Sequence, residues 1–208
     1  MISADEALDR LKTGNQRFAA GRGSGAVASQ LRRAELVVGQ EPFAIVLGCS
    51  DSRVPAEIVF DQGLGDLFVI RVAGNIVAAS QIGSVEFAVE RFGTPLVVVL
   101  GHSRCGAVVA TLQELTRPTE HQSRNLRSIV DRVRPSVEAL LATELRDDPA
   151  ALVARAVRAN VRASVSHLRR GSRSLRRHLE DNRLVVVGAE YSLESGIVEF
   201  LDGSTGDA

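Results

Sequence analysis

The amino-acid sequence predicts an α/β protein with a mostly parallel central sheet, an antiparallel edge strand, flanking helices and an N-terminal helical arm. Short β-branched apolar runs recur along the chain, and strands without polar residues are typical of sheets buried on both faces. Longer stretches with helical spacing separate these runs, which favours right-handed crossovers between parallel strands. With 208 residues, 45% of them hydrophobic, the chain is large enough for one such domain.

The N-terminal arm is expected to contain two helices. Residues 4–20 have amphipathic spacing, with Ser3 as the N-cap and Glu6 completing a capping box. A GRGSGA segment leads to a second helix over residues 27–39. Because the arm has little apolar surface, we expect it to pack against the sheet or a partner subunit. We assign residues 1–40 to the arm and residues 41–208 to the α/β domain.

Five apolar runs are expected to form the strands, and three of the expected strand ends are marked by a glycine, at Gly48, Gly101 and Gly188. The four predicted parallel strands are residues 43–48 (FAIVLG), 67–72 (LFVIRV), 96–101 (LVVVLG) and 184–189 (LVVVGA). Residues 197–201 follow an ESG turn so closely that they should pair antiparallel at the edge. Helices are expected over residues 83–91, after Gly106 and within residues 126–177.

Composition excludes several classes of protein. Two cysteines cannot build a disulfide framework, and no apolar run reaches the roughly 18 residues of a membrane span. The N-terminus carries three acids in its first ten residues and lacks the apolar core of a signal peptide. We therefore expect a soluble, reduced, cytoplasmic protein with no membrane partner.

Both cysteines lie just beyond predicted strands. Cys49 follows the first strand, and His102 and Cys105 follow the third in the segment GHSRCG. Ligands of open parallel sheets bind beyond the carboxyl ends of the strands, so these side chains should meet. Two thiolates and one imidazole suit zinc, and three protein ligands leave the open position of a catalytic site. An enzyme with a nucleophilic thiol is the remaining alternative.

Asp51 and Arg53 follow the first cysteine closely enough to flank such a metal ion. The planar guanidinium of arginine can hold both oxygens of a carboxylate. A carboxylate left unpaired could become a fourth metal ligand, which would make a zinc site net negative and block water. We therefore expect Asp51 to be a metal ligand only in a closed state. The alternative is an ordinary surface ion pair of little energetic weight.

Together these segments resemble the β-class carbonic anhydrases. The matching motifs are Cys49-Ser-Asp-Ser-Arg, the segment from Gly65 to Arg71 with Ala73 and Asn75, Gly101-His-Ser-Arg-Cys-Gly106, and Val187-Gly-Ala-Glu-Tyr191. The resemblance runs from about residue 40 through most of the chain. It implies Zn²⁺ held by Cys49, His102 and Cys105, and a catalytic dyad of Asp51 and Arg53. It also implies a homodimer or tetramer in which the arm, residues 1–40, embraces the partner.

Two positions depart from the family pattern. Plant-type members carry a glutamine where an ungapped match places Gly63, and Gln62 lies one residue earlier. Some bacterial members carry a tryptophan, part of a non-catalytic bicarbonate pocket, where Val46 stands. We therefore expect no bicarbonate inhibition through that pocket, although Arg71 and Tyr191 match its other members.

No proton shuttle is predicted. The remaining histidines lie in polar contexts and are expected to face solvent; they are His121, His167 and His178.

The resemblance implies zinc-dependent, reversible hydration of CO₂ to bicarbonate and a proton through zinc-bound hydroxide. One alternative is hydrolysis of CS₂ or COS at the same zinc site. Another is a non-enzymatic nucleic-acid-binding protein that uses residues 124–178, which hold 13 arginines and five acids. Because that segment has no aromatic residue and the chain has a net charge of +0, we expect no nucleic-acid partner. We expect these arginines to be solvated or paired with acids elsewhere.

Overall fold

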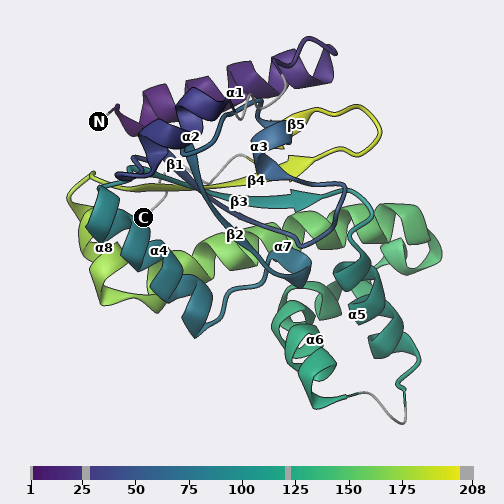
Figure 1. Ribbon diagram of the computed structural model, residues 1–208. Helices are drawn as coiled ribbons and strands as arrows, with labels where there is room; N and C mark the ends of the chain where they lie inside the picture. Colours follow the sequence, from purple (N-terminus) through teal and green to yellow (C-terminus); the bar gives the residue numbers. More distant parts are fainter. Residues whose placement is uncertain (1, 25–28, 120–122, 202–208) are drawn as a thin grey trace.

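The computed structural model describes residues 2–24, 29–119 and 123–201. Its centre is a five-stranded sheet in the order β2-β1-β3-β4-β5 (Figure 1). The strands are β1 (Ala44–Gly48), β2 (Leu67–Arg71), β3 (Leu96–His102), β4 (Val185–Tyr191) and β5 (Val198–Phe200). The first four pair in parallel, and β5 pairs antiparallel with β4. The predicted fold class and all five strands are confirmed.

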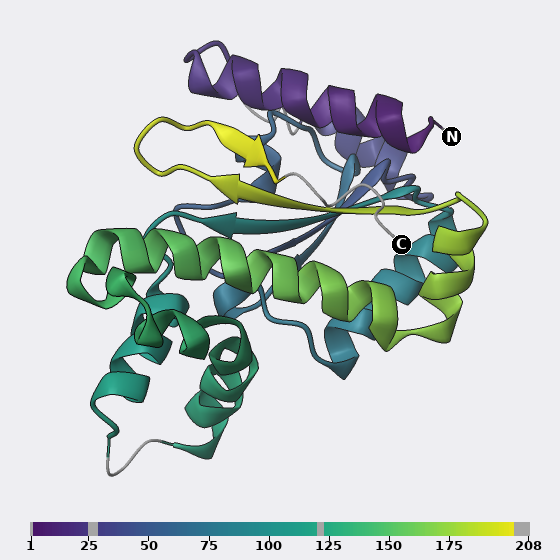
Figure 2. The same ribbon diagram turned by 180° about the vertical axis from the view of Figure 1, so that it is seen from behind.

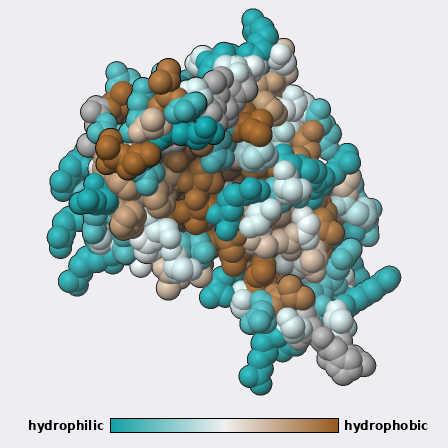
Figure 3. Space-filling view, in the orientation of Figure 1, coloured by the Kyte–Doolittle hydropathy of each residue, from teal (hydrophilic) through white to brown (hydrophobic). Residues whose placement is uncertain are grey.

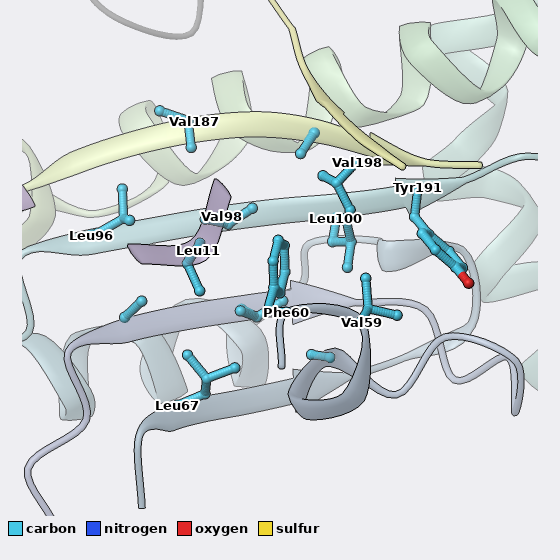
Figure 4. Close-up of a cluster of buried hydrophobic side chains, with 14 of the residues drawn as sticks. Leu11, Val59, Phe60, Leu67, Leu96, Val98, Leu100, Val187, Tyr191 and Val198 are labelled. Atoms are coloured by element: carbon cyan, nitrogen blue, oxygen red, sulfur yellow. The ribbon is translucent and has the colours of Figure 1, made fainter. Parts of the chain in front are cut away.

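Burial on both faces explains why the strand sequences are apolar without alternation. On β1, Val46 belongs to the core of one face, and its neighbours Ile45 and Leu47 belong to the core of the other. Figure 4 shows the first core, where Leu11 and Phe60 approach the sheet from outside. The sheet is therefore the middle layer of the domain, as predicted.

Helices cover both faces of the sheet (Figures 1 and 2). The first face carries α1 (Ala4–Ala19) and α3 (Ala56–Val59); the second carries α4 (Ala79–Phe92), α7 (Pro149–Gly171) and α8 (Arg173–Glu180). A third apolar cluster packs α5 (Gly106–Thr116) and α6 (Arg124–Val137) against α7. This cluster contains both cysteines, so it encloses the predicted site. None of the described helices is long and apolar enough to cross a membrane.

The arm packs against the sheet of its own chain. The predicted capping box is present: Ser3 Oγ accepts from Glu6 N at 3.2 Å, and Glu6 Oε2 accepts from Ser3 N at 2.7 Å. The buried amide of Asn15 donates to the carbonyls of Val59 and Gly196, at 3.1 and 2.9 Å. Its Oδ1 also accepts from the backbone N–H of residue 198 at 2.8 Å. Contact with a partner subunit stays a prediction.

A second anchor of the arm is the buried carboxylate of Asp61. It accepts hydrogen bonds from Arg17 Nε at 2.6 Å and from the N–H and hydroxyl of Ser24 at 2.7 and 2.8 Å. Burial raises the pKa of Asp61, but the bonds from Arg17 and Ser24 lower it overall. The resulting stabilisation is present above the unfolded-state pKa of about 3.9 and is lost as pH falls through the folded-state pKa.

Several predicted helix limits are wrong. The second helix of the arm, α2, spans only Gln30–Leu36, and residues 27 and 28 lie outside the described residues. The helix predicted over residues 83–91 begins at Ala79, where Ala78 caps it without a side-chain hydrogen bond. Its start therefore has none of the usual capping signals.

The stretch 126–177 is divided rather than continuous. Two short 3₁₀ helices, η2 (Glu138–Ala142) and η3 (Glu144–Asp147), separate α6 from α7. Asp148 then caps α7, whose first residue is Pro149. Ser172 follows α7 and caps α8. Local capping side chains thus set these boundaries.

Two glycines expected at strand ends lie inside their strands. β3 continues one residue beyond Gly101, and β4 continues beyond Gly188. A Cβ at Gly101 would lie 2.4 Å from Val161 Cγ2, and one at Gly188 would lie 2.8 Å from Val161 Cγ1. These positions therefore lack side chains so that α7 can approach the sheet.

We expect Gly101→Ala to lower the free energy of unfolding by about 1–3 kcal/mol, because the added methyl group overpacks against Val161. Val161→Ala should recover part of this loss when the two substitutions are combined. Chemical denaturation measures both effects.

The control is Gly83→Ala on α4, where among the described residues no heavy atom outside the adjacent residues and the nearby backbone of α4 lies within 4 Å of the new Cβ. It should increase stability by about 0.5–1 kcal/mol through helix propensity. Equal stability of Gly101→Ala and the unsubstituted protein would contradict the packing role.

Candidate metal centre

Cys49, His102 and Cys105 meet at the ends of two neighbouring strands: Cys49 follows β1, His102 is the last residue of β3, and Cys105 lies just after it. Parallel pairing sets Gly48 beside Leu100, so β1 and β3 end at the same edge of the sheet. The candidate ligand atoms all lie within 4.8 Å of one another, and the two sulfur atoms are 4.0 Å apart. This separation is about twice a disulfide bond length of 2.05 Å, so both thiols are free. The predicted meeting of these side chains is confirmed.

His102 directs one unpaired nitrogen into this cluster. Its side chain is 0% exposed, and Nδ1 lies 2.9 Å from Ser103 O. Because a carbonyl only accepts, we assign the proton to Nδ1, which leaves a lone pair on Nε2. Nε2 has no hydrogen-bond partner among the described residues, and such a buried group costs about 1–3 kcal/mol. A metal ion would use this lone pair, so the donor set fits zinc.

The two thiols have opposite ionisation tendencies. The hydrogen bond from Cys105 lowers the pKa of Cys49, and hydrogen bonds from the Gly74 and Asp51 N–H groups lower it further. The hydrogen bond with Cys49, together with burial, raises the pKa of Cys105. Cys49 is therefore the thiol that ionises first. Binding of a metal ion would have to displace the proton of Cys105 as well.

Asp51 lies beside the cluster and is held by Arg53. Arg53 Nε donates to Oδ1 at 2.9 Å, Nη2 donates to Oδ2 at 2.8 Å, and the Arg53 backbone N–H donates to Oδ1 at 3.0 Å. These bonds hold the pKa of Asp51 well below its usual range. Asp51 Oδ2 lies 3.8 Å from His102 Nε2. The structure thus places an ionised carboxylate next to the cluster with both oxygens bound to arginine.

Arg71 fixes the backbone that carries Cys49 and Asp51. Its Nε donates to Cys49 O at 3.0 Å, and Nη2 donates to Asp51 O at 2.6 Å. The two other positions compared with that family pocket lie in the core: Val46, which replaces the tryptophan, is 0% exposed, and the ring of Tyr191 packs 6.3 Å from the ring of Phe18.

The amide of Gln62 is engaged elsewhere. Its Nε2 donates to Phe60 O at 2.7 Å, and its Oε1 accepts from Arg10 Nε at 3.0 Å. It therefore joins α1 to the turn after α3 instead of approaching the cluster. Of the remaining histidines, His167 is exposed as predicted and His178 is partly buried, whereas residue 121 lies outside the described residues.

Sequence reasoning missed two polar residues of α7. Asn160 Nδ2 donates to Gly74 O at 2.8 Å, and Ser164 Oγ donates to Asn75 O at 3.0 Å. Gly74 in turn donates its N–H to Cys49 Sγ at 3.3 Å. The available signal was a pair of polar residues, four apart, within the apolar stripe of a helix.

The arginine-rich segment forms few ion pairs within the described chain. Arg158 contacts Glu190 at 2.7 Å and Glu199 at 2.5 Å, and Arg134 contacts Asp131 at 3.8 Å. The expected pairing with acids elsewhere in the chain is therefore met by Arg158.

Comparison with known proteins agrees with this geometry. The family model for carbonic anhydrase matches residues 44–198. The chain is 42% identical over 186 residues to carbonic anhydrase 2 of Mycobacterium tuberculosis, covering 89% of this chain and 87% of the relative. It is 43% identical over 189 residues to carbonic anhydrase of Mycolicibacterium smegmatis, covering 91% and 89%.

A solved structure shows the same fold. The β-carbonic anhydrase CafA of Aspergillus fumigatus aligns with a TM-score of 0.75 at 28% identity, over 98% of this chain and 92% of that one. The matched residues include both strand-end motifs. The fold, the cysteine–histidine cluster and these relatives agree, and the chain belongs to the β-class carbonic anhydrases.

Proposed function

We propose that this enzyme hydrates CO₂ reversibly with a zinc ion held by Cys49, His102 and Cys105. The observation that carries the proposal is that candidate ligand atoms of His102 and both cysteines lie within 4.8 Å of one another, while the buried Nε2 of His102 has no hydrogen-bond partner among the described residues. A bound zinc ion would lower the pKa of a water bound to it towards neutrality, and would so supply a nucleophile at ordinary pH.

Asp51 and Arg53 are the proposed catalytic residues. Asp51 offers a carboxylate oxygen close to His102 Nε2, where it can accept a hydrogen bond from the attacking oxygen and direct it at the carbon of CO₂. Arg53 holds that carboxylate through both oxygens. Asp51 would act as a metal ligand only in a closed state, after release from Arg53.

The pKa of Asp51 also limits how activity can depend on pH. Since its pKa is lowered, the carboxylate stays charged throughout the neutral range. A fall of activity on the acid side of neutrality therefore does not come from protonation of Asp51; it would come from protonation of the nucleophile or from the closed state. Activity should rise with pH, reaching its maximum somewhat above neutral, because thiolates reduce the charge of the metal more than imidazoles do.

We also propose that the enzyme is cytoplasmic and forms a homodimer or a multiple of one. β2 is an edge strand of the sheet, and exposed apolar side chains lie near it. Phe87 is 54% exposed and lies 6.2 Å from the ring of Phe68 on β2, while Val37 and Val38 follow α2 with exposures of 85% and 93%. Figure 3 shows hydrophobic surface across the middle of this face. A second copy of the chain would cover it.

The first test replaces Cys105 with serine, which preserves shape but removes a soft ligand. Cys105→Ser should lose both bound zinc and CO₂ hydration, as measured by elemental analysis and by stopped-flow assay over about pH 6.5–9. Parallel assays with CS₂ and COS test the alternative substrates. A metal-free Cys105→Ser protein with full hydration activity would refute the proposed function.

Arg53→Ala should lower kcat/KM about 100-fold while zinc is retained, because the carboxylate loses its orientation and is free to enter the closed state. Even if the pKa of Asp51 returns to about 3.9, the group remains charged at neutral pH, so the loss should be similar at pH 7 and pH 9.

Arg53→Lys is the matched control for charge. It keeps the cation but cannot bond both oxygens in one plane, so it should restore little activity. Full activity of Arg53→Lys would show that charge alone suffices and would contradict the orienting role.

Light scattering after size-exclusion chromatography tests the assembly. The unsubstituted protein should be dimeric or larger, and Phe87→Asp should shift it towards the monomer. Ile197→Asp is the control, because Ile197 is 55% exposed but precedes β5 at the opposite edge of the sheet. A monomeric unsubstituted protein would contradict the proposed homodimer.

A further inference from the structure

The short helix η1 (Ala73–Asn75), which follows β2, has an unfavourable backbone conformation. Gly74 has a φ of 71°, and Asn75 has a φ of 44°. Left-handed backbone costs a non-glycine residue about 1–3 kcal/mol and persists only where the surroundings fix it. A Cβ at Gly74 would lie 3.0 Å from Ala107 Cβ at the start of α5, so the turn is also tightly enclosed.

Two buried side chains of α7 hold this turn. Asn160 is 2% exposed and bonds to Gly74 O, and Ser164 is 5% exposed and bonds to Asn75 O. Residues four apart share one face of a helix, so both side chains point at the same turn. Buried polar groups are costly unless they are hydrogen-bonded, and here the partners are consecutive carbonyls of η1.

These bonds differ from ordinary hydroxyl contacts within helices. The buried Thr111 on α5 donates to Ala107 O, four residues earlier in the same helix. Such a hydrogen bond within one helix is common, and it does not hold any other segment in place. Ser164, by contrast, reaches a segment 89 residues away in sequence.

The turn ends in a direct contact with a proposed metal ligand. The Gly74 N–H donates to Cys49 Sγ at 3.3 Å, and both atoms are buried. An N–H donated to a thiolate draws electron density from the sulfur, and groups that hydrogen-bond to metal ligands tune the affinity for the metal. The electron density on Cys49 therefore depends on where the peptide of Gly74 is held.

We propose that Asn160 and Ser164 are positioning residues for Cys49. They hold η1 from α7 so that the Gly74 N–H stays aligned with Cys49 Sγ. This inference rests on the proposed function in one respect, that Cys49 is a zinc ligand. Gly74, which makes the contact, lies on η1, whereas Asn160 and Ser164 lie on α7. Asn160 and Ser164 can therefore be replaced without changing any proposed zinc ligand.

The test variants of the positioning role are Asn160→Leu and Ser164→Ala. Each has a control variant with the same replacement at a buried residue that does not contact η1. Asn15→Leu removes the buried amide that anchors α1, and Ser172→Ala removes the buried hydroxyl that caps α8. Neither hydrogen bond involves η1. Thermal unfolding should show that the controls lose stability comparable to the test variants.

The first readout needs no metal ion. Amide hydrogen exchange of Gly74, followed by NMR in the metal-free protein, should accelerate in Asn160→Leu and Ser164→Ala beyond the change in global unfolding. In the two controls, the exchange rate of Gly74 should rise no more than the loss of global stability explains. Unaltered Gly74 protection in both test variants would overturn the proposal whatever the metal content.

The second readout uses the loaded protein. Competition with a chromophoric chelator should show zinc affinity reduced about 10-fold in each test variant and up to about 100-fold in the double variant. In cobalt-substituted protein, the thiolate-to-metal charge-transfer band should move to longer wavelength as Cys49 gains electron density. Both controls should match the unsubstituted protein in affinity and in band position.

The two readouts separate failure of the inference from failure of the proposed function. Test variants with normal zinc affinity and a normal cobalt band would overturn the positioning role while leaving the zinc site intact. Unsubstituted protein that binds no zinc would overturn the proposed function, and with it the claim that Cys49 is positioned as a ligand.

Discussion

The parallel register between β1 and β3 is the constraint on which the metal centre depends. It sets Gly48 beside Leu100, so that Cys49 and His102 leave the sheet at the same edge. A slip of one residue would move every side chain of β1 to the opposite face and would remove Cys49 from the cluster. Since both faces of β1 are packed at nearly full burial, such a slip is strongly disfavoured.

Helix α7 connects the packing of the sheet with the geometry of the site. Val161 fits against Gly101 and Gly188, which sets how closely the helix approaches the sheet. Asn160, the residue before it, bonds to the turn that contacts Cys49. The distance between α7 and the sheet depends on Val161, and the position of the turn depends on its neighbour Asn160. A change that moves α7 away from the sheet would therefore also disturb Cys49.

The sequence was sufficient for the features that depend on local pattern. The strands were predictable because β-branched apolar runs such as residues 96–101 are typical of strands buried on both faces of a sheet. The cluster was predictable because the two cysteines of the sequence follow predicted strands. Gly101 was misassigned as a strand end because its reason, the approach of Val161, lies in another element. Asn160 resembles an ordinary polar helix residue until its partner, 86 residues away, is known.

The bonds of Asn15 have a consequence for how the chain acquires its structure during synthesis. Its amide pairs with residues 181 and 183 positions later in the sequence, at Gly196 and Val198. At a translation rate of about 5–20 residues per second, these partners emerge roughly 9–37 s after Asn15 itself. Throughout that interval α1 lacks part of its final docking site, and closing such a distant contact is slow. The first helix to be made is therefore among the last to be locked in place, and a nascent chain that stalls before β5 would leave α1 without its anchor at Gly196 and Val198 and open to chaperones and proteases.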